Sequence, residues 1–131
     1  MIGLDTNVLV RYAAQDDAVQ SPKAAELIES LTSENPGFVS HVVLVELAWV
    51  LGRCYTTERA AIAQFLEQLI RTKEIIIEAA DVAWRAVRAY RDGTGDFPDL
   101  LIERIAAAAG CEHTATFDSG AAKKAGMRLI G

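Results

Sequence analysis

Short apolar runs alternate with longer helical segments along this chain, and this alternation is the strongest constraint on its fold. Ile75–Ile77 is β-branched and bounded by charged residues, as expected of a buried strand. Similar runs predict strands at 1–4, 38–39, 113–117 and 128–130. Strands separated by helices favour a parallel sheet with helices on both faces. We therefore predict an α/β fold: a three-layer α/β/α sandwich around a short parallel sheet of four to five strands.

Capping residues and apolar spacing predict a helix after almost every strand. Ser40 is a candidate N-cap for a helix over 41–53, and Thr57 for a helix over 58–72. The other predicted helices cover 7–14, 21–32, 80–91, 96–110 and a short segment after Asp118. No repeat, linker or low-complexity stretch interrupts the chain, so residues 1–131 are predicted to form a single domain.

Composition and charge exclude several classes of protein. The 131 residues are 51% hydrophobic and 24% charged, which is typical of a globular chain and not of a disordered one. The net charge of −5 argues against a generic basic nucleic-acid-binding domain. No apolar run approaches the ~20 residues of a membrane span, and the N-terminus lacks a signal-peptide pattern. Cys54 and Cys111 have no metal-ligand spacing, and we expect both to be buried in a protein of the reducing cytoplasm.

Four aspartates follow or open predicted elements. Asp5 follows the first strand, Asp118 follows the strand at 113–117, and Asp96 and Asp99 open a helix after a glycine-containing loop. Each of them alone is explained by helix capping or by the helix dipole. Parallel strands end at one edge of a sheet, however, and ligands of open α/β sheets bind at that edge. We therefore expect these carboxylates to converge.

Glu46 is not explained by capping. It lies in the middle of a helix that is apolar on all sides, so we expect that helix to be buried on most faces. A buried carboxylate costs several kcal/mol unless it is paired, neutralised or bound to a metal. One alternative is an ion pair with Arg11 or Arg53. The other places Glu46 at the cleft above the sheet edge.

Converging carboxylates without counter-charges require a cation between them. All the candidate ligands are oxygens, which favours Mg²⁺ or Mn²⁺ over Zn²⁺. His41 and His113 have no partner at ligand spacing, and we do not predict them as ligands. Acidic sites that hold such ions carry out phosphoryl transfer or phosphodiester hydrolysis.

Four segments, in their order along the chain, resemble the motifs of the PIN-domain nucleases, and more narrowly of the VapC-type toxins of bacterial toxin–antitoxin pairs. They are Ile2–Asn7, Glu46 within its apolar helix, Asp96–Ile102 and Thr114–Asp118. The resemblance covers essentially the whole chain. It implies a magnesium-dependent endoribonuclease that hydrolyses RNA in the cytoplasm, pairs as a homodimer and is held inactive by a cognate VapB-like antitoxin.

The same resemblance assigns roles to individual residues. It implies that the catalytic and metal-binding acids are Asp5, Glu46, Asp99 and Asp118. Asp96 matches an additional acid that some members have. The small polar positions that would hold acids or water by hydrogen bonds are matched by Thr6, Asn7 and Thr116.

A basic row and two tryptophans have both structural and functional interpretations. Arg85, Arg88 and Arg91 are spaced by three on one predicted helix, which suits either a solvated face or an RNA phosphate-binding ridge. The pair Lys123–Lys124 has the same two interpretations. Trp49 and Trp84 are expected in the core or at an interface rather than as base-stacking residues.

Three other functions fit the sequence less well. A haloacid-dehalogenase-type phosphatase needs a second Asp two positions after the first, where this chain has Asn7. A response-regulator receiver domain also binds Mg²⁺, but it needs an acid after the middle strand, where this chain has Ser40. A PIN-like interaction module without activity would not need the intact acid set. A non-catalytic signalling or interaction module remains the alternative function.

Overall fold

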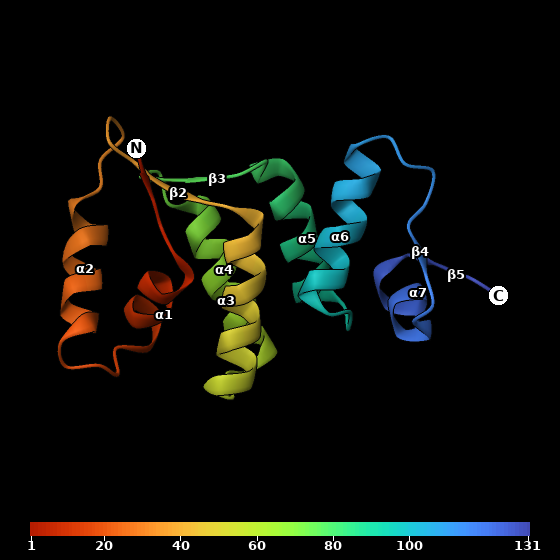
Figure 1. Ribbon diagram of the computed structural model, residues 1–131, viewed down its shortest axis with the longest axis horizontal. Coiled ribbons are helices and arrows are strands. Elements are labelled where there is room, and N and C mark those ends of the chain that lie inside the picture. The colour runs from red at the N-terminus through yellow and green to blue at the C-terminus, as the bar shows by residue number, and fades with distance from the viewer. The chain divides into compact units, whose positions relative to one another are not determined.

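The computed structural model describes all 131 residues as seven helices and five short strands (Figure 1). The helices are α1 (Thr6–Ala14), α2 (Gln20–Ser30), α3 (His41–Cys54), α4 (Arg59–Arg71), α5 (Ala80–Asp92), α6 (Phe97–Ala108) and α7 (Ser119–Ala125). The strands are β1 (Ile2–Gly3), β2 (Gly37–Val39), β3 (Ile75–Ile77), β4 (Ala115–Thr116) and β5 (Arg128–Leu129). All strand pairs are parallel, which confirms the predicted α/β class.

The chain forms two compact units, which we describe separately. The N-terminal unit is Met1–Glu78 and the C-terminal unit is Ala79–Gly131. The five strands are divided in the same way, into a sheet of order β1-β2-β3 and a pair β4-β5. None of the helices is both long enough and apolar enough to span a membrane.

The sheet of the N-terminal unit positions the first acid. Its central strand β2 places Phe38 beside Gly3 of β1 on one side and Ile76 of β3 on the other. Because the three strands are parallel, their carboxyl ends lie along one edge. The chain leaves this edge at Asp5 after β1 and at Ser40 after β2, and each residue is the N-cap of the helix that follows.

Two helix starts test the predicted caps of the N-terminal unit. Ser40 caps α3 as predicted, because its Oγ accepts a hydrogen bond from the Val43 N–H at 3.2 Å. The N-cap of α4 is Glu58 and not the predicted Thr57. The N–H of Thr57 donates to the carbonyl oxygen of Leu51 at 2.9 Å, so Thr57 still belongs to the turn that ends α3.

The helices of the N-terminal unit enclose its core. Helix α1 packs against α2 and α3, and α3 also packs against α4. The largest fully buried side chains of these helices are Leu9, Leu44, Leu47 and Leu66. Their burial fixes the rotation of α1 and α3 about their axes, and with it the faces on which Thr6 and Glu46 lie.

The C-terminal unit is built on the packing of α5 against α6. The rings of Tyr90 and Phe97 meet edge to face there, with centroids 5.7 Å apart and an interplanar angle of 73°. The strand predicted over 113–117 is reduced to β4, because its partner β5 has only two residues. Thr116 of β4 lies beside Leu129 of β5, and α7 connects the two strands.

Both cysteines are exposed, so the expectation that they are buried is wrong. Cys54 is the last residue of α3, and Cys111 follows the end of α6. Each cysteine therefore lies at or just beyond the end of a helix, outside the part of the helix that packs against the core.

Candidate active site

The N-terminal unit brings two of the predicted acids, Asp5 and Glu46, to a single threonine. The Oδ1 of Asp5 accepts a hydrogen bond from the N–H of Thr6 at 2.7 Å. The hydroxyl of Thr6 in turn donates to Oε1 of Glu46, also at 2.7 Å. Thr6 is only 7% exposed, so the packing of α1 holds this link in place. Thr6 thus joins the start of α1 to the middle of α3.

Glu46 itself is exposed, which contradicts the expectation that α3 is buried on most faces. Val42 and Trp49 lie four residues before and three residues after it on the same side of the helix, and they are 67% and 56% exposed. Trp49 is therefore not a core residue. The buried side of α3 is formed by Leu44, Leu47, Ala48 and Leu51.

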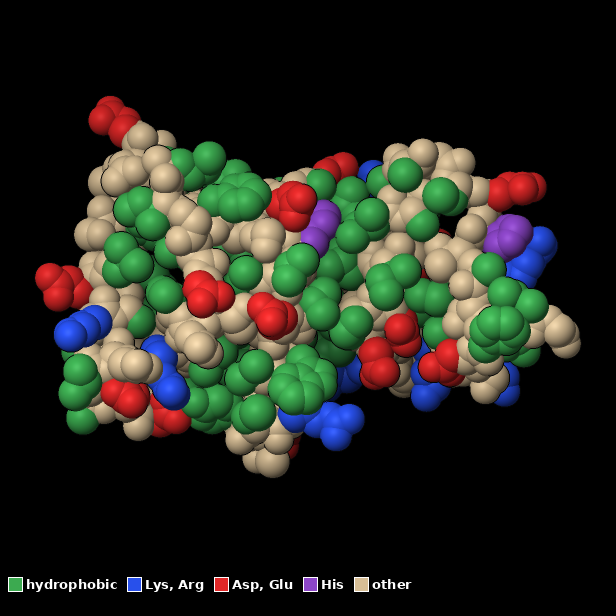
Figure 2. Space-filling view, in the orientation of Figure 1, with side chains coloured by type: hydrophobic (Ala, Val, Ile, Leu, Met, Phe, Trp, Pro, Cys, Tyr) green, Lys and Arg blue, Asp and Glu red, His purple; other side chains and the backbone are tan.

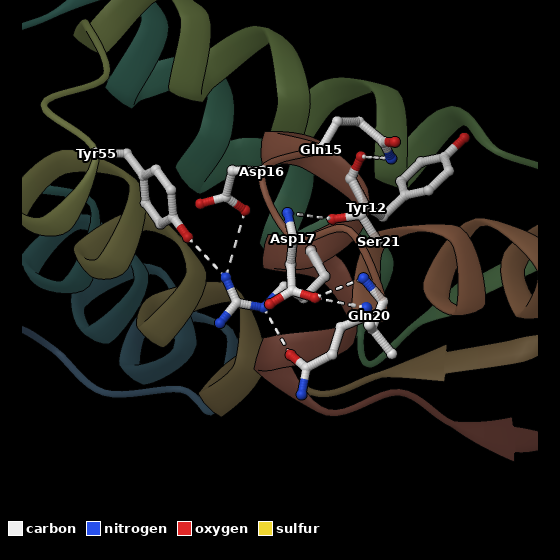
Figure 3. A network of polar contacts seen from close by, with 9 residues as sticks. Tyr12, Gln15, Asp16, Asp17, Gln20, Ser21 and Tyr55 are labelled. Carbon is white, nitrogen blue, oxygen red and sulfur yellow. Dashed lines mark hydrogen bonds and ion pairs between the residues drawn. The ribbon is translucent and has the colours of Figure 1, made fainter.

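Neither Arg53 nor Arg11 forms an ion pair with Glu46, so that alternative is wrong. The guanidinium of Arg11 donates to Oε1 of Gln20 at 2.8 Å and to the hydroxyl of Tyr55 at 3.0 Å, and it lies 3.4 Å from Asp16 (Figure 3). These contacts tie the end of α1 to the start of α2 and to the end of α3. The hydrogen bond that Glu46 accepts comes from the hydroxyl of Thr6.

Asn7 faces another part of the N-terminal unit. It lines a hollow of about 300 Å³ between α1 and α2, together with Val8, Arg11 and Leu27 among others. No hydrogen bond joins Asn7 to Asp5 or Glu46. Of the polar residues predicted to support the acids, the structure therefore brings Thr6, and not Asn7, to the pair in this unit.

The C-terminal unit brings the other three acids to one pocket of about 170 Å³. Asp96 is the N-cap residue of α6, Asp99 lies in the first turn of that helix, and Asp118 is the N-cap of α7. The other residues that line the pocket are Thr94, Gly95, Gly120, Ala121, Lys124 and Ala125.

Asp118 is fixed at this pocket by the turn between β4 and α7. Its Oδ1 accepts hydrogen bonds from the N–H groups of Gly120 at 2.7 Å and Ala121 at 3.3 Å. Its own N–H donates to Oγ1 of Thr116 at 3.0 Å. Thr116 therefore contacts the backbone of this acid, in agreement with a supporting role. The side chain of Asp96, in contrast, makes no capping hydrogen bond.

The pocket is electrostatically unfavourable for its own carboxylates. Burial raises the pKa of Asp99 above its ordinary value of 3.8, and the negative charges of Asp96 and Asp118 raise this pKa further. Asp99 is half-buried, while Asp96, Asp118 and Lys124 are exposed. A cation in the pocket would relieve this repulsion.

The donor set fits a hard divalent cation. The candidate metal ligands of both units are carboxylate oxygens, and Mg²⁺ and Mn²⁺ prefer oxygen ligands. No group of three or more acidic, histidine or cysteine side chains lies close enough together to hold a metal ion. The three aspartates of the C-terminal unit share one pocket, however, and the raised pKa of Asp99 is the electrostatic sign of a site that favours a cation.

The predicted basic ridge lies on an exposed side of α5. Arg85, Arg88 and Arg91 are all exposed, opposite the buried residues of the same helix. The guanidinium of Arg91 contacts Asp92 at 2.9 Å. None of the three arginines lines the carboxylate pocket, so a role in RNA binding remains a prediction.

Two features of the pocket were not predicted from the sequence: the role of Gly95, and the difference between Lys124 and Lys123. A Cβ at Gly95 would lie 2.7 Å from the carbonyl oxygen of Lys124, so this glycine allows a close approach of α7 to the start of α6. Helical periodicity was the available signal for Lys124, because residues 120, 121, 124 and 125 share one side of α7 and all of them line the pocket.

Comparisons with known proteins agree with the motif resemblance at the level of the family. The chain matches the family described as PIN domain over residues 2–127. No curated protein matches the chain. The family match spans both units, and so includes the acids of both.

Proposed function

We propose that this chain, which belongs to the PIN domain family, is a magnesium- or manganese-dependent endoribonuclease and the toxin of a toxin–antitoxin pair. PIN domains are generally metal-dependent nucleases, so the family supports hydrolysis of phosphodiester bonds. The observation that carries the proposal is the pocket of the C-terminal unit, where three aspartates meet and where burial and the charges of Asp96 and Asp118 raise the pKa of Asp99. The four-motif resemblance to VapC-type toxins supports RNA as the substrate.

In the proposed reaction, acids of each unit bind divalent metal ions. Asp5, Glu46, Asp99 and Asp118 would hold the metal ions, with Asp96 as an additional acid. A bound divalent ion supplies an activated water and neutralises charge on the phosphate. Thr6 keeps Asp5 and Glu46 oriented through its two hydrogen bonds, and the turn at Thr116 keeps Asp118 at the pocket.

The test is cleavage of a labelled RNA with Mg²⁺ or Mn²⁺ and with excess EDTA. We expect cleavage only with the metal, poor substitution by Zn²⁺, and products with 5′-phosphate and 3′-hydroxyl ends, because attack by water needs no ribose 2′-oxygen. Asp99→Asn should lower the rate by about 100-fold or more. Asp81→Asn, which removes an exposed carboxylate of α5 outside the pocket, is the matched control. Cleavage in EDTA, or 2′,3′-cyclic phosphate ends, would refute the mechanism.

We further propose that the protein works in the cytoplasm as a homodimer. Large hydrophobic side chains are exposed among the carboxylates on the face shown in Figure 2. On α6, Ile102 and Ile105 are 52% and 40% exposed, and on α3 Val42 and Trp49 are more exposed still. Exposed apolar patches usually mark an interface. Light scattering at micromolar concentration should give twice the 14.2 kDa of one chain, and the mass of a monomer would contradict the dimer.

The proposed regulator is a VapB-like antitoxin that inserts an Arg or Lys side chain into the pocket of the C-terminal unit. Three carboxylates and one lysine line that pocket, so negative charge is in excess and a cationic side chain of the antitoxin is favoured there. Co-expression of the toxin with its antitoxin should suppress cleavage, and Asp99→Asn should weaken the complex. A complex that is unaffected by Asp99→Asn would place the inhibitory contact elsewhere.

A further inference from the structure

The hollow between α1 and α2 of the N-terminal unit has no role in the proposed function. It has a volume of about 300 Å³, which is at the lower limit for a small-ligand site. Its apolar lining includes Val8 and Leu27, and its polar lining is formed by Asn7, Arg11, Gln20 and Lys23. No acidic residue lines it, in a chain whose net charge is −5. The hollow therefore combines an apolar surface with a local excess of positive charge.

The hollow offers hydrogen-bond donors and cations to a ligand. Nε of Arg11 donates to Oε1 of Gln20 at 2.8 Å, which occupies the carbonyl oxygen of that amide and leaves its NH₂ group as a donor (Figure 3). The Nη2 of Arg11 donates to no other residue, because the remaining contacts of this guanidinium are made by Nη1. Lys23 is exposed and forms no ion pair.

Two aspartates near Arg11, Asp16 and Asp17, stay outside the hollow. Asp16 lies 3.4 Å from Nη1 of Arg11, and Oδ1 of Asp17 accepts from the N–H groups of Val19 and Gln20 at 3.0 Å and 2.6 Å. Neither carboxylate faces a ligand in the hollow. The hollow consequently favours an anion.

The hollow adjoins the acid pair of the N-terminal unit. Asn7 lines it and directly follows Thr6, which donates hydrogen bonds to Asp5 and Glu46. Two residues of chain span at most ~7 Å, so the Cα atoms of Asp5 and Asn7 lie within that distance of each other. Arg11 is one turn further along α1, on the same side of the helix as Asn7. An RNA whose cleaved phosphate lies at the acid pair has a neighbouring nucleotide within reach of the hollow.

We propose that this hollow is a subsite for one nucleotide of the RNA, next to the phosphate that is cut. Lys23 and the NH₂ group of Gln20 bind the phosphate of that nucleotide, and the apolar lining at Val8 and Leu27 contacts its base. The inference rests on the proposed function and adds a binding site to it. An acidic segment of a protein carries the same charge, but the RNA is favoured because the hollow adjoins acids at which RNA must bind to be cut.

The experiment measures RNA binding in EDTA, where neither cleavage nor a metal ion contributes. Gln20→Glu keeps the oxygen that accepts from Arg11 and replaces the NH₂ donor with a negative charge, so the fold is retained. Fluorescence anisotropy of a labelled RNA should show binding weakened by about 10-fold or more in Gln20→Glu and by about 3-fold in Lys23→Gln. The matched controls are Gln64→Glu and Lys73→Gln, which change exposed residues of the same unit outside the hollow and should bind RNA like wild type.

A second measurement locates the ligand. NMR titration of wild type with adenosine 5′-monophosphate in EDTA should shift the amide signals of Asn7, Gln20 and Lys23 and leave that of Asp99 unmoved. Inorganic phosphate should shift the same three signals more weakly, because it has no base to contact the apolar lining.

Equal RNA binding by wild type and Gln20→Glu, an equal loss in Gln64→Glu, or nucleotide-induced shifts confined to residues outside the hollow would overturn the inference. If Gln20→Glu weakens the complex with the antitoxin and leaves RNA binding unchanged, the hollow binds an acidic protein segment and the inference is wrong. Failure of the proposed function is read separately, from the absence of cleavage by wild type in Mg²⁺. A wild type that never cleaves RNA but binds the nucleotide in the hollow would contradict the proposed function and leave the subsite standing.

Discussion

The carboxylates of the two units differ in how they are stabilised. In the N-terminal unit, Asp5 and Glu46 each accept a hydrogen bond from Thr6, one from its N–H and one from its hydroxyl. In the C-terminal unit, Asp118 accepts hydrogen bonds from the start of α7, but Asp96 makes no capping hydrogen bond. Burial, together with the negative charges of Asp96 and Asp118, raises the pKa of Asp99.

This difference assigns different tasks to the two sets of acids. A hydrogen bond stabilises the ionised carboxylate and fixes its direction, whereas neighbouring negative charges oppose ionisation. We therefore expect the pocket of the C-terminal unit to supply most of the affinity for the metal. The pair of the N-terminal unit is already oriented, and we expect it to contribute mainly to the geometry of the reaction.

The largest expected effect is that of Glu46→Gln on catalysis. RNA cleavage should fall by about 100-fold or more, because the side chain keeps its shape but loses its charge. The free energy of unfolding in EDTA should change by less than ~0.5 kcal/mol, because Gln retains the oxygen that accepts from Thr6. Glu29→Gln, on an exposed position of α2, is the matched control. Strong destabilisation in EDTA with near-normal cleavage would show that Glu46 is a structural residue.

Gly95→Ala should disturb the C-terminal pocket alone. The new Cβ would lie 2.7 Å from the carbonyl oxygen of Lys124, a backbone atom, so α7 must move away from the start of α6. We expect a loss of about 1–3 kcal/mol in unfolding free energy, together with weaker Mg²⁺ binding. Gly3→Ala is the control, because a Cβ there meets no atom within 4 Å. If chemical denaturation gives equal stabilities for both variants, the close contact at Gly95 does not constrain the pocket.

A smaller effect separates two neighbouring lysines. Lys124 lines the pocket and Lys123 does not, although both are exposed residues of α7. Lys124→Gln should reduce the slope of log binding constant against log salt concentration by the amount expected for about one phosphate contact. Lys123→Gln should leave this slope unchanged. Titrations of RNA at several salt concentrations measure both slopes. Identical slopes for the two variants would remove Lys124 from the binding surface.

The smallest effect is the pH dependence of stability without metal. The pKa of Asp99 is raised in the folded protein, so its contribution to stability is present below the ordinary value of 3.8 and is lost as the pH rises through the folded pKa. Asp99→Asn should therefore gain stability relative to wild type between low and neutral pH. Urea unfolding in EDTA at several pH values measures this gain. If Asp99→Asn instead loses stability relative to wild type as the pH rises, the pocket favours the ionised form of Asp99.

Features decided by residues close together along the chain were predicted better than features decided by how helices and strands pack. The Ser40 cap and the positions of Asp96 and Asp118 at helix starts were predicted, because capping is decided within a few residues. Thr57 is not the cap because α4 begins at Arg59, so the residue that precedes the helix is Glu58.

The exposed side of α3 was beyond prediction for a related reason. A helix with apolar residues all around its axis does not indicate which side the other helices cover, so the exposed side with Glu46 and Trp49 could not be distinguished from the buried side. The acid set itself was predictable because each acid stands next to a recognisable element boundary or motif. Its division between a pair joined through Thr6 and a trio that shares one pocket depends on side-chain geometry, as does the contact at Gly95.

The most direct test of the assignment is calorimetric titration of Mg²⁺ into wild type, Asp99→Asn and Glu46→Gln. Both substitutions remove one carboxylate charge and preserve the side-chain shape, so they differ only in the unit that they affect. We expect Asp99→Asn to weaken Mg²⁺ binding more than Glu46→Gln does, because a cation in the C-terminal pocket relieves the repulsion between its carboxylates. An equal or larger loss of affinity in Glu46→Gln would contradict this expectation.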